Sequence, residues 1–296
     1  MTIANRPSKL SLPASNAGYP TVLDYLIAHF PRISGAIWLQ RMAAGKVHWH
    51  DGTRISAQTL FRPRQRVYYY REVAQEIQVP FAEQILYQDR HILVADKPHF
   101  LPVTPGGRYV DECLQNRLRR RTGLECLQAL HRLDRPTAGL VLFSVNPETR
   151  HLYHSLFESR QIDKRYQAVA SVEGNENRMG QQWRVVNRIE RSKPRFLMRV
   201  TAGKPNSCSQ IYCLDQRAGR ALFELRPVTG KTHQLRLHMA SLGWPILNDR
   251  YYPVCQPEAA DDYNRPLQLL AQQLRFVDPV TRQTRNFESA RRLQLG

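Results

Sequence analysis

The chain is poor in acidic residues and has no long hydrophobic run. Its 296 residues include 25 Asp and Glu against 43 Lys and Arg, a formal net charge of +18. An excess of this size is typical of proteins that bind a polyanion, either nucleic acid or an anionic membrane surface. No run approaches the roughly 20 apolar residues of a membrane span, and residues 1–20 lack the apolar core of a signal peptide. We therefore expect a soluble cytoplasmic protein that does not span a membrane and binds nucleic acid.

Cysteine is scarce and scattered. No Cys-x-x-Cys pair occurs, so we expect neither a disulfide framework nor a zinc site. The thiols should instead be reduced and mostly buried. The five cysteines are Cys113, Cys126, Cys208, Cys213 and Cys255.

Two patterns resemble functional motifs but lack an essential residue. Gly230-Lys231-Thr232 matches the end of a phosphate-binding loop, but Leu225 stands where that loop needs a glycine. His151 and His154 lie one helical turn apart, yet no third ligand accompanies them. We therefore expect neither a nucleoside triphosphatase nor a metal site.

Composition and hydrophobic pattern divide the chain into a leader and two domains. Residues 1–20 hold three prolines and several small polar residues, so we expect a flexible leader. Residues 21–75 should form a small α/β domain, with helices over 21–30 and 36–44. Residues 1–75 carry ten Lys and Arg against three Asp and Glu, a higher density of positive charge than the rest of the chain.

The small domain resembles an RNA-binding fold of the S-four type, first named in a protein of the small ribosomal subunit. Ala44-Gly45-Lys46-Val47 and Asp51-Gly52 stand at the turns where that family enters its strands. The resemblance implies an RNA-binding domain over residues 21–75. An ordinary small α/β cap is the alternative.

Residues 76–296 read as a larger α+β domain. Strand-like runs outnumber helices and do not alternate with them, which favours a mixed, largely antiparallel sheet over a doubly wound parallel one. We expect helices over 110–121 and 148–159, and an amphipathic helix in 229–243 that ends at Gly243. The last segment, 267–288, should form two strands about an Asp-Pro turn.

Three segments contain side chains able to act together on a polyanionic substrate. In His131-Arg132-Leu133-Asp134-Arg135, a carboxylate lies between two cations that favour its ionised form. Tyr166 lies among charged residues at the start of a strand, and Arg236 lies in the helix expected over 229–243. One acid, one phenol and one arginine could thus meet over a pocket.

These segments resemble the RluA family of RNA pseudouridine synthases over roughly residues 80–290. Four motifs stand in the family's order, and they are Asp96-Lys97-Pro98, the tract 131–139 around Asp134, Lys164-Arg165-Tyr166, and the tract 229–238 around Arg236. The sequence departs from the family pattern at Ala138, Lys231, Asn248 and Ala271, which leaves the target RNA open.

The resemblance implies isomerisation of uridine to pseudouridine in ribosomal or transfer RNA by a monomer that needs no cofactor and no metal. Asp134 would be the nucleophile, attacking either the uracil ring or the ribose carbon of the glycosidic bond. Arg236 would hold that carboxylate ionised, and Tyr166 would stack on the uracil. Arg132 would fill the space that a flipped nucleotide leaves, or hold that nucleotide. The expected RNA-binding residues are Arg132, Arg135, Lys164, Arg165, Lys231 and His233.

Simpler roles remain open for these residues. Asp134 could cap a turn, Tyr166 could be a core aromatic and Arg236 a surface arginine. The whole chain could be a non-catalytic RNA-binding or ribosome-assembly factor, or a phosphodiesterase that uses His131 or His233. Two arginine-rich clusters are expected to contact phosphates, Arg117/Arg119/Arg120/Arg121 and Arg188/Arg191/Lys193/Arg195.

Overall fold

The chain forms two compact units in the computed structural model, which describes residues 2–16, 18–172 and 177–295. One unit comprises Met1–Ile77 with Pro105–Asp111, and the other Gln78–Thr104 with Glu112–Gly296. We call them the small unit and the large unit. The small unit includes the segment 105–111, which folds apart from its sequence neighbours.

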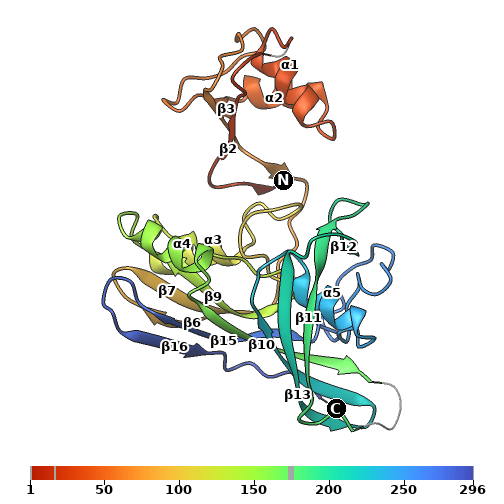
Figure 1. Ribbon diagram of the computed structural model, residues 1–296. Helices are drawn as coiled ribbons and strands as arrows, with labels where there is room; N and C mark the ends of the chain where they lie inside the picture. The colour runs from red at the N-terminus through yellow and green to blue at the C-terminus, as the bar shows by residue number, and fades with distance from the viewer. Residues whose placement is uncertain (1, 17, 173–176, 296) are drawn as a thin grey trace. The chain divides into compact units, whose positions relative to one another are not determined.

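The small unit packs two helices on a three-stranded sheet (Figure 1). The helices are α1 (Val22–His29) and α2 (Gly35–Ala43), and the sheet has the order β2 (Ser8–Ser11), β4 (Arg66–Tyr69), β3 (Val47–His48). Thr21 caps α1 through the amide of Asp24, whose carboxylate accepts in turn from the Thr21 amide. Both expected helices are confirmed. The core includes Val22, Leu26, Trp38, Val47 and Val67.

The segment expected as a flexible leader contains two strands. β1 (Thr2–Ile3) pairs with β5 (Glu72–Val73), and β2 pairs with β4. Leu12 is buried in the core of the small unit and Leu10 packs against it. The expectation of a flexible leader was wrong at these strands because the few apolar residues among prolines and polar residues gain their partners only from a strand more than fifty residues away.

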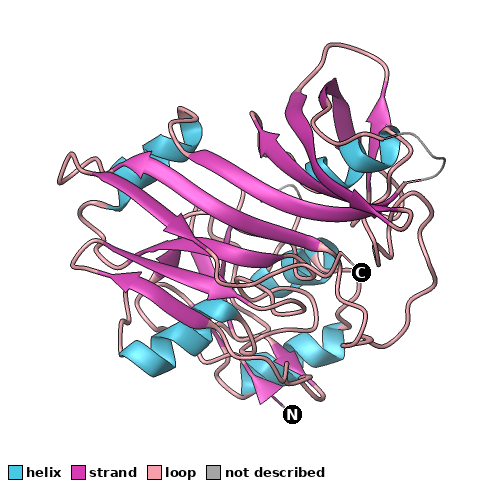
Figure 2. Cartoon of the chain, turned by 90° about the horizontal axis from the view of Figure 1, so that it is seen from below, coloured by secondary structure: helices cyan, strands magenta, loops and turns pink. Residues whose placement is uncertain are grey.

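An 11-stranded sheet forms the large unit (Figure 2). Nine strands follow in the order β12-β11-β13-β14-β10-β15-β9-β7-β6, while β16 pairs with β15 and β8 with β9. Pairing within the described part of this sheet is antiparallel except between β9 and β15. The expected mixed, largely antiparallel α+β fold is thus confirmed. The strands are β6 (Gln84–Gln88), β7 (Ile92–Lys97), β8 (Gln128–Ala129), β9 (Ala138–Ser144), β10 (Asp163–Ser171), β11 (Gln182–Arg191), β12 (Met198–Thr201), β13 (Ser207–Arg217), β14 (Arg220–Pro227), β15 (Leu269–Val277) and β16 (Thr284–Glu288).

The helices of the large unit are α3 (Leu114–Thr122), α4 (Arg150–Glu158) and α5 (Gln234–Ser241). Tyr153 and Leu156 of α4 pack on the β7–β9 part of the sheet. Leu235 and Met239 of α5 pack on the β10–β14 part. The expectation that α5 is amphipathic was wrong, because its residues from Gln234 to Met239 are all buried. Its polar side chains can be buried because they have hydrogen-bond partners inside the protein.

The cysteines differ in part from expectation. All five are free thiols, but only Cys113 and Cys213 are buried, while Cys126 and Cys255 are exposed.

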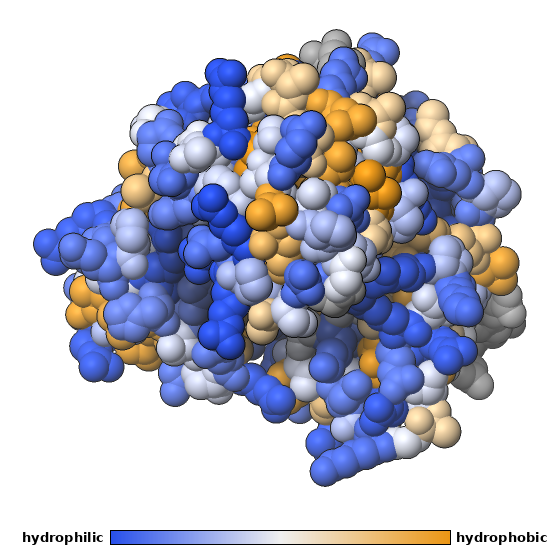
Figure 3. Space-filling view, turned by 90° about the horizontal axis from the view of Figure 1, so that it is seen from above, coloured by the Kyte–Doolittle hydropathy of each residue, from blue (hydrophilic) through white to orange (hydrophobic). Residues whose placement is uncertain are grey.

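Hydrophilic side chains dominate the face seen in Figure 3, where hydrophobic side chains form smaller patches. No described helix has the length and apolar character that crossing a membrane requires.

The beginning of β9 makes a close contact with β15. Gly139 pairs with Ala271 of β15, and Ala271 pairs on its other side with Tyr166 of β10. Gly139 has φ 110°, and a Cβ there would lie 2.3 Å from the carbonyl oxygen of Ala271. Three strands therefore converge four to five residues after Asp134, which brings the loop before β9 close to β10.

We expect Gly139→Ala to destabilise the protein by about 3 kcal/mol or more, since it adds a clash with backbone to an unfavourable φ. Urea unfolding of the full chain measures this change. Gly123→Ala is the matched control, because Gly123 has φ 69° but open space around its Cβ position. Its cost should be about 1–2 kcal/mol. Equal costs at the two positions would contradict the close contact between β9 and β15.

Candidate active site

A buried lysine donates a hydrogen bond to the loop that carries Asp134. Lys97, at the end of β7, is fully buried. Its Nζ donates to the carbonyls of Pro98, Leu101 and Arg135 at 3.0, 2.7 and 3.0 Å. The amide of Thr137 donates to the Asp134 carbonyl at 3.0 Å and closes a turn. These bonds hold the carbonyl groups of Asp134 and Arg135, while the side chain of Asp134 remains 26% exposed.

His131 has a structural role in the same loop. Its Nε2 accepts a hydrogen bond from the Leu142 amide at 3.0 Å, and its ring stacks on Phe157 with centroids 4.8 Å apart. Burial, with a smaller effect of the Lys164 charge, lowers the pKa of His131 to about 3. The imidazole is therefore neutral and its acceptor nitrogen is occupied, which removes the support for His131 as a phosphodiesterase base.

Arg236 of α5 lies between two carboxylates. Its Nη1 is 3.3 Å from Oδ2 of Asp134, while Nε and Nη2 donate to the two oxygens of Asp249 at 2.8 and 2.6 Å. The Arg236 side chain is only 2% exposed and that of Asp249 only 1%. Burial alone would lower the pKa of Arg236, but the bonds and charges of Asp249 and then Asp134 raise it above its ordinary value. The guanidinium is thus a fixed positive charge, and Arg236 is not a surface arginine.

Asp249 is a site residue that sequence reasoning missed. Besides Arg236, it accepts hydrogen bonds from the amides of Tyr251 and Tyr252 at 2.8 and 3.2 Å. The rings of these tyrosines lie 4.9 and 5.3 Å from the Arg236 guanidinium carbon. The signal lay in Asn248-Asp249-Arg250-Tyr251-Tyr252, an acid beside two aromatics shortly after the Arg236 tract.

His233 also faces the nucleophile candidate. Its Nε2 lies 3.8 Å from Oδ2 of Asp134, and its Nδ1 lies 2.8 Å from the hydroxyl of Tyr252. Burial lowers the pKa of His233, and the charge of Asp134 opposes this effect only in part. The residue expected to bind RNA is thus a neutral imidazole next to Asp134.

Tyr166 is directed by an irregularity in the sheet. It pairs with Leu225 of β14 and Ala271 of β15, and the β10–β15 register shifts between Arg165 and Tyr166. Such bulges re-aim side chains next to active sites. Burial raises the pKa of Tyr166, and the charge of Asp134 raises it further. The phenol therefore stays protonated and lies within the electrostatic reach of Asp134.

The expected RNA-binding residues separate into two groups. Arg132 and Lys231 are exposed. Arg135 instead forms a two-point ion pair with Asp261, with bonds of 2.6 and 2.8 Å. Arg165 lies 3.6 Å from Asp163 and 3.9 Å from Glu224. Lys164 is partly buried, which lowers its pKa, and its Nζ lies close to Gly230.

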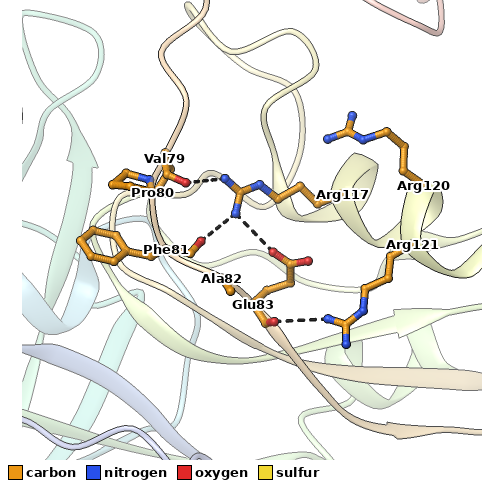
Figure 4. A pocket seen from close by; sticks show the side chains of 8 residues that line it. All are labelled: Val79, Pro80, Phe81, Ala82, Glu83, Arg117, Arg120 and Arg121. Atoms are coloured by element: carbon orange, nitrogen blue, oxygen red, sulfur yellow. Dashed lines mark hydrogen bonds and ion pairs between the residues drawn. The ribbon is translucent and has the colours of Figure 1, made fainter.

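The arginine-rich cluster on α3 is likewise divided. Arg117 donates to the carbonyls of Val79 and Phe81 at 2.6 and 2.7 Å and pairs with Glu83 and Glu112, which builds the wall of a shallow groove (Figure 4). Arg119 donates to the Leu127 carbonyl. The exposed members, Arg120 and Arg121, line the groove. No residue proposed for catalysis lies among the groove's lining residues.

Residues between β11 and β12, and the first residue of β12, contact the two tyrosines that flank Arg236. Phe196 is 52% exposed and its ring contacts Tyr251 with centroids 5.2 Å apart. The backbone of Met198 exchanges two hydrogen bonds with the Tyr252 hydroxyl.

Among the residues with described positions, no group of three His, Cys, Asp or Glu side chains is arranged to hold a metal ion.

Comparison with known proteins identifies the chain. The family model of RNA pseudouridylate synthases matches residues 91–241. Dual-specificity RNA pseudouridine synthase RluA of Pasteurella multocida is 32% identical over 218 residues, which covers 69% of this chain and 91% of that protein. The RluA of Haemophilus influenzae is also 32% identical, with the same coverage. The chain is therefore an RNA pseudouridine synthase, an isomerase that modifies RNA. Within this class it belongs to the RluA family.

A solved structure supports the fold. Human RNA Pseudouridylate Synthase Domain Containing 1 superimposes with a TM-score of 0.57 at 23% identity, covering 73% of this chain and 86% of that one. The family-model match begins at residue 91, so it does not include the segment 21–75. The S-four type remains a prediction for that segment.

We expect Asp249→Asn to destabilise the protein by about 3–5 kcal/mol, because it removes the carboxylate from a buried ion pair and leaves the Arg236 charge uncompensated. Chemical unfolding of the full chain measures this loss. Asp261→Asn is the matched control: it removes an equivalent two-point pair from Arg135, whose side chain is 30% exposed, and should cost about 1 kcal/mol or less. Similar losses in the two variants would contradict the importance assigned to burial.

We expect His131→Gln to make the protein less sensitive to acid. The unfolded chain takes up a proton on His131 near pH 6.5, but the folded protein does so only near the lowered pKa of about 3. Between these values the unfolded state binds more protons, so the free energy of unfolding falls as the pH falls. Gln keeps an acceptor for the Leu142 amide without titrating, which should remove up to about 1.4 kcal/mol per pH unit of this slope.

Urea unfolding at several pH values between about 7 and 5 measures that slope. His151→Gln is the control, since the His151 side chain is exposed on α4. The slope should be lower than that of the native chain only in the His131 variant. An unchanged slope there would show that His131 is not held neutral by its surroundings.

Proposed function

We propose that this synthase isomerises specific uridines in structured ribosomal or transfer RNA with Asp134 as its nucleophile. The observation that carries this proposal is the division of Arg236 between two carboxylates. Asp249 accepts from two of its donors in the interior, and a third donor reaches the partly exposed carboxylate of Asp134. A charged, oriented and accessible carboxylate is what nucleophilic attack requires.

Each group near Asp134 has a role in this reaction. Asp134 attacks the uracil ring or the ribose carbon and forms a covalent bond to it, and the bond between ribose and nitrogen breaks. A bond from the ribose to a ring carbon then forms, and the bond to Asp134 breaks again, which restores the free carboxylate. The ring carbon loses its hydrogen and the released nitrogen gains one, so the product is an isomer. Tyr166, protonated and beside Asp134, stacks on the uracil and can relay a proton at its hydroxyl. His233, whose Nε2 lies 3.8 Å from Oδ2 of Asp134, is proposed to limit the movement of that side chain.

RNA binding follows from the exposed cations. The target base must leave its stack before Asp134 can reach it, and exposed Arg132 is the side chain proposed to fill its place. Lys231 and the cluster Arg188/Arg191/Lys193/Arg195 are proposed to contact phosphates. Such contacts fix the position of the RNA on the protein without reading its sequence. The small unit is proposed to contribute a further RNA contact. Five free thiols support the proposed cytoplasmic location.

A non-catalytic RNA-binding factor is the alternative function. Binding alone needs exposed cations but not a buried arginine that orients an accessible acid. The same is true of Tyr166, since a binding surface has no need for a phenol beside that acid.

The test uses ribosomal and transfer RNA transcribed with tritium at the uracil carbon that forms the new bond. We expect the native chain to release tritium and Asp134→Asn to release it at least about a thousandfold more slowly, because the amide is not a nucleophile. Asp163→Asn is the control, because its carboxylate is 46% exposed and belongs to no proposed catalytic contact.

RNA affinity is measured in parallel by filter binding. Retained affinity with lost release assigns Asp134 to chemistry. Full release by Asp134→Asn would overturn its role as nucleophile. No release by the native chain from either RNA would overturn the proposed substrate classes.

A further inference from the structure

The sheet of the small unit has an aromatic face opposite its core. In β4, Val67 and Tyr69 belong to the hydrophobic core, so Tyr68 between them points to the other face. His48 pairs with Tyr68 across β3, and Tyr70 lies next to His48. None of these three residues belongs to the core cluster. Their presence on the sheet is therefore not explained by core packing.

Four rings form a continuous cluster on this face. Tyr68 stacks on His48 with centroids 5.5 Å apart and an interplanar angle of 12°. His50 contacts Tyr68 at 5.6 Å, and Tyr70 contacts His48 at 6.0 Å. Tyr68, His48 and Tyr70 are partly exposed and His50 is exposed. The cluster thus presents ring surface to solvent.

Polar contacts hold the rings in place. Nδ1 of His48 donates to the carbonyl of Trp49 at 2.7 Å, and Nδ1 of His50 lies 2.9 Å from the Tyr68 hydroxyl. A ring cluster fixed in this way is preorganised and loses little conformational entropy when a ligand stacks on it.

Exposed cations border the rings on both sides. The register places Lys9 of β2 beside Tyr68, and Arg54 beside His48 on the far side of β3. The row across the sheet therefore runs cation, tyrosine, histidine, cation. Arg66, two residues before Tyr68, adds a third cation on the same face. Lys9, Arg54 and Arg66 are all exposed.

We propose that this face binds an unpaired stretch of RNA, with bases stacked on the Tyr68–His48 cluster and phosphates on Lys9, Arg54 and Arg66. Stacking needs bases whose faces are open, whereas paired bases are covered by their neighbours in the helix. The flanking cations lie on both sides of the rings, where phosphates of a backbone that crosses the rings can reach them. The inference rests on the proposed RNA substrate and adds a second contact, for unpaired nucleotides of the same RNA.

The experiment compares two fluorescent RNA probes with the full chain. One is an oligouridine of about twelve nucleotides, and the other is a fully paired hairpin with the same number of phosphates. We expect Tyr68→Leu to weaken oligouridine binding about fivefold or more and hairpin binding less than about twofold, because stacking is lost. Tyr68→Phe keeps the ring and should bind oligouridine nearly as the native chain does.

A second pair of variants tests the cations. Lys9→Gln and Arg54→Gln should each reduce the salt dependence of oligouridine binding by about one phosphate contact. The matched control is Arg220→Gln, an exposed arginine of the large unit for which no RNA contact is proposed, which should leave the salt dependence of oligouridine binding unchanged.

Crosslinking locates the contact directly. Oligouridine that carries 4-thiouridine, irradiated with the native chain and digested, should label the peptide that contains Tyr68. Labels confined to other peptides would overturn the inference, as would Tyr68→Leu with native affinity. An equal loss on the hairpin would overturn the restriction to unpaired RNA. Tritium release by the native chain tests the proposed function separately, so the two proposals can fail independently.

Discussion

The buried contact between Arg236 and Asp249 is the interaction on which the site depends. Asp249 neutralises and orients a guanidinium whose charge would otherwise lie uncompensated in the interior. Because this pair uses Nε and Nη2, it leaves Nη1 directed at Asp134. The rings of Tyr251 and Tyr252 enclose the same guanidinium. The positive charge that faces Asp134 is thus supplied by a buried residue that solvent does not screen.

The sheet supplies the second constraint, which is the position of Tyr166. Asp134 precedes β9, and the close approach of Gly139 to Ala271 brings this strand next to β15. Ala271 then pairs with Tyr166, so a single strand separates the strand of Tyr166 from the strand that follows Asp134. Helix α5 adds Arg236 to this arrangement, while Lys97 holds the loop from below.

The sequence predicted the site better than it predicted the surroundings of the site. Asp134, Tyr166 and Arg236 could be named because each lies in a long motif, and α1 because its cap is local. Asp249 was missed, since the two aromatic residues that follow it mark the segment but do not show that its acid pairs with a buried arginine. The burial of α5 was missed for the same reason, because the partners of Gln234 and His238 lie on other strands. β2 was missed because its pairing with β4 spans most of the small unit.

The same distinction applies to the positive charge of the chain. A count of basic residues treats all cations alike, but the structure separates them by their partners. Arg117, Arg119 and Arg236 bind carbonyls or carboxylates and hold the fold together. Arg132 and Lys231, together with Lys9 and Arg54 of the small unit, extend into solvent, where RNA phosphates can reach them. Part of the excess of +18 therefore stabilises the protein, and the exposed part defines the surface available to RNA.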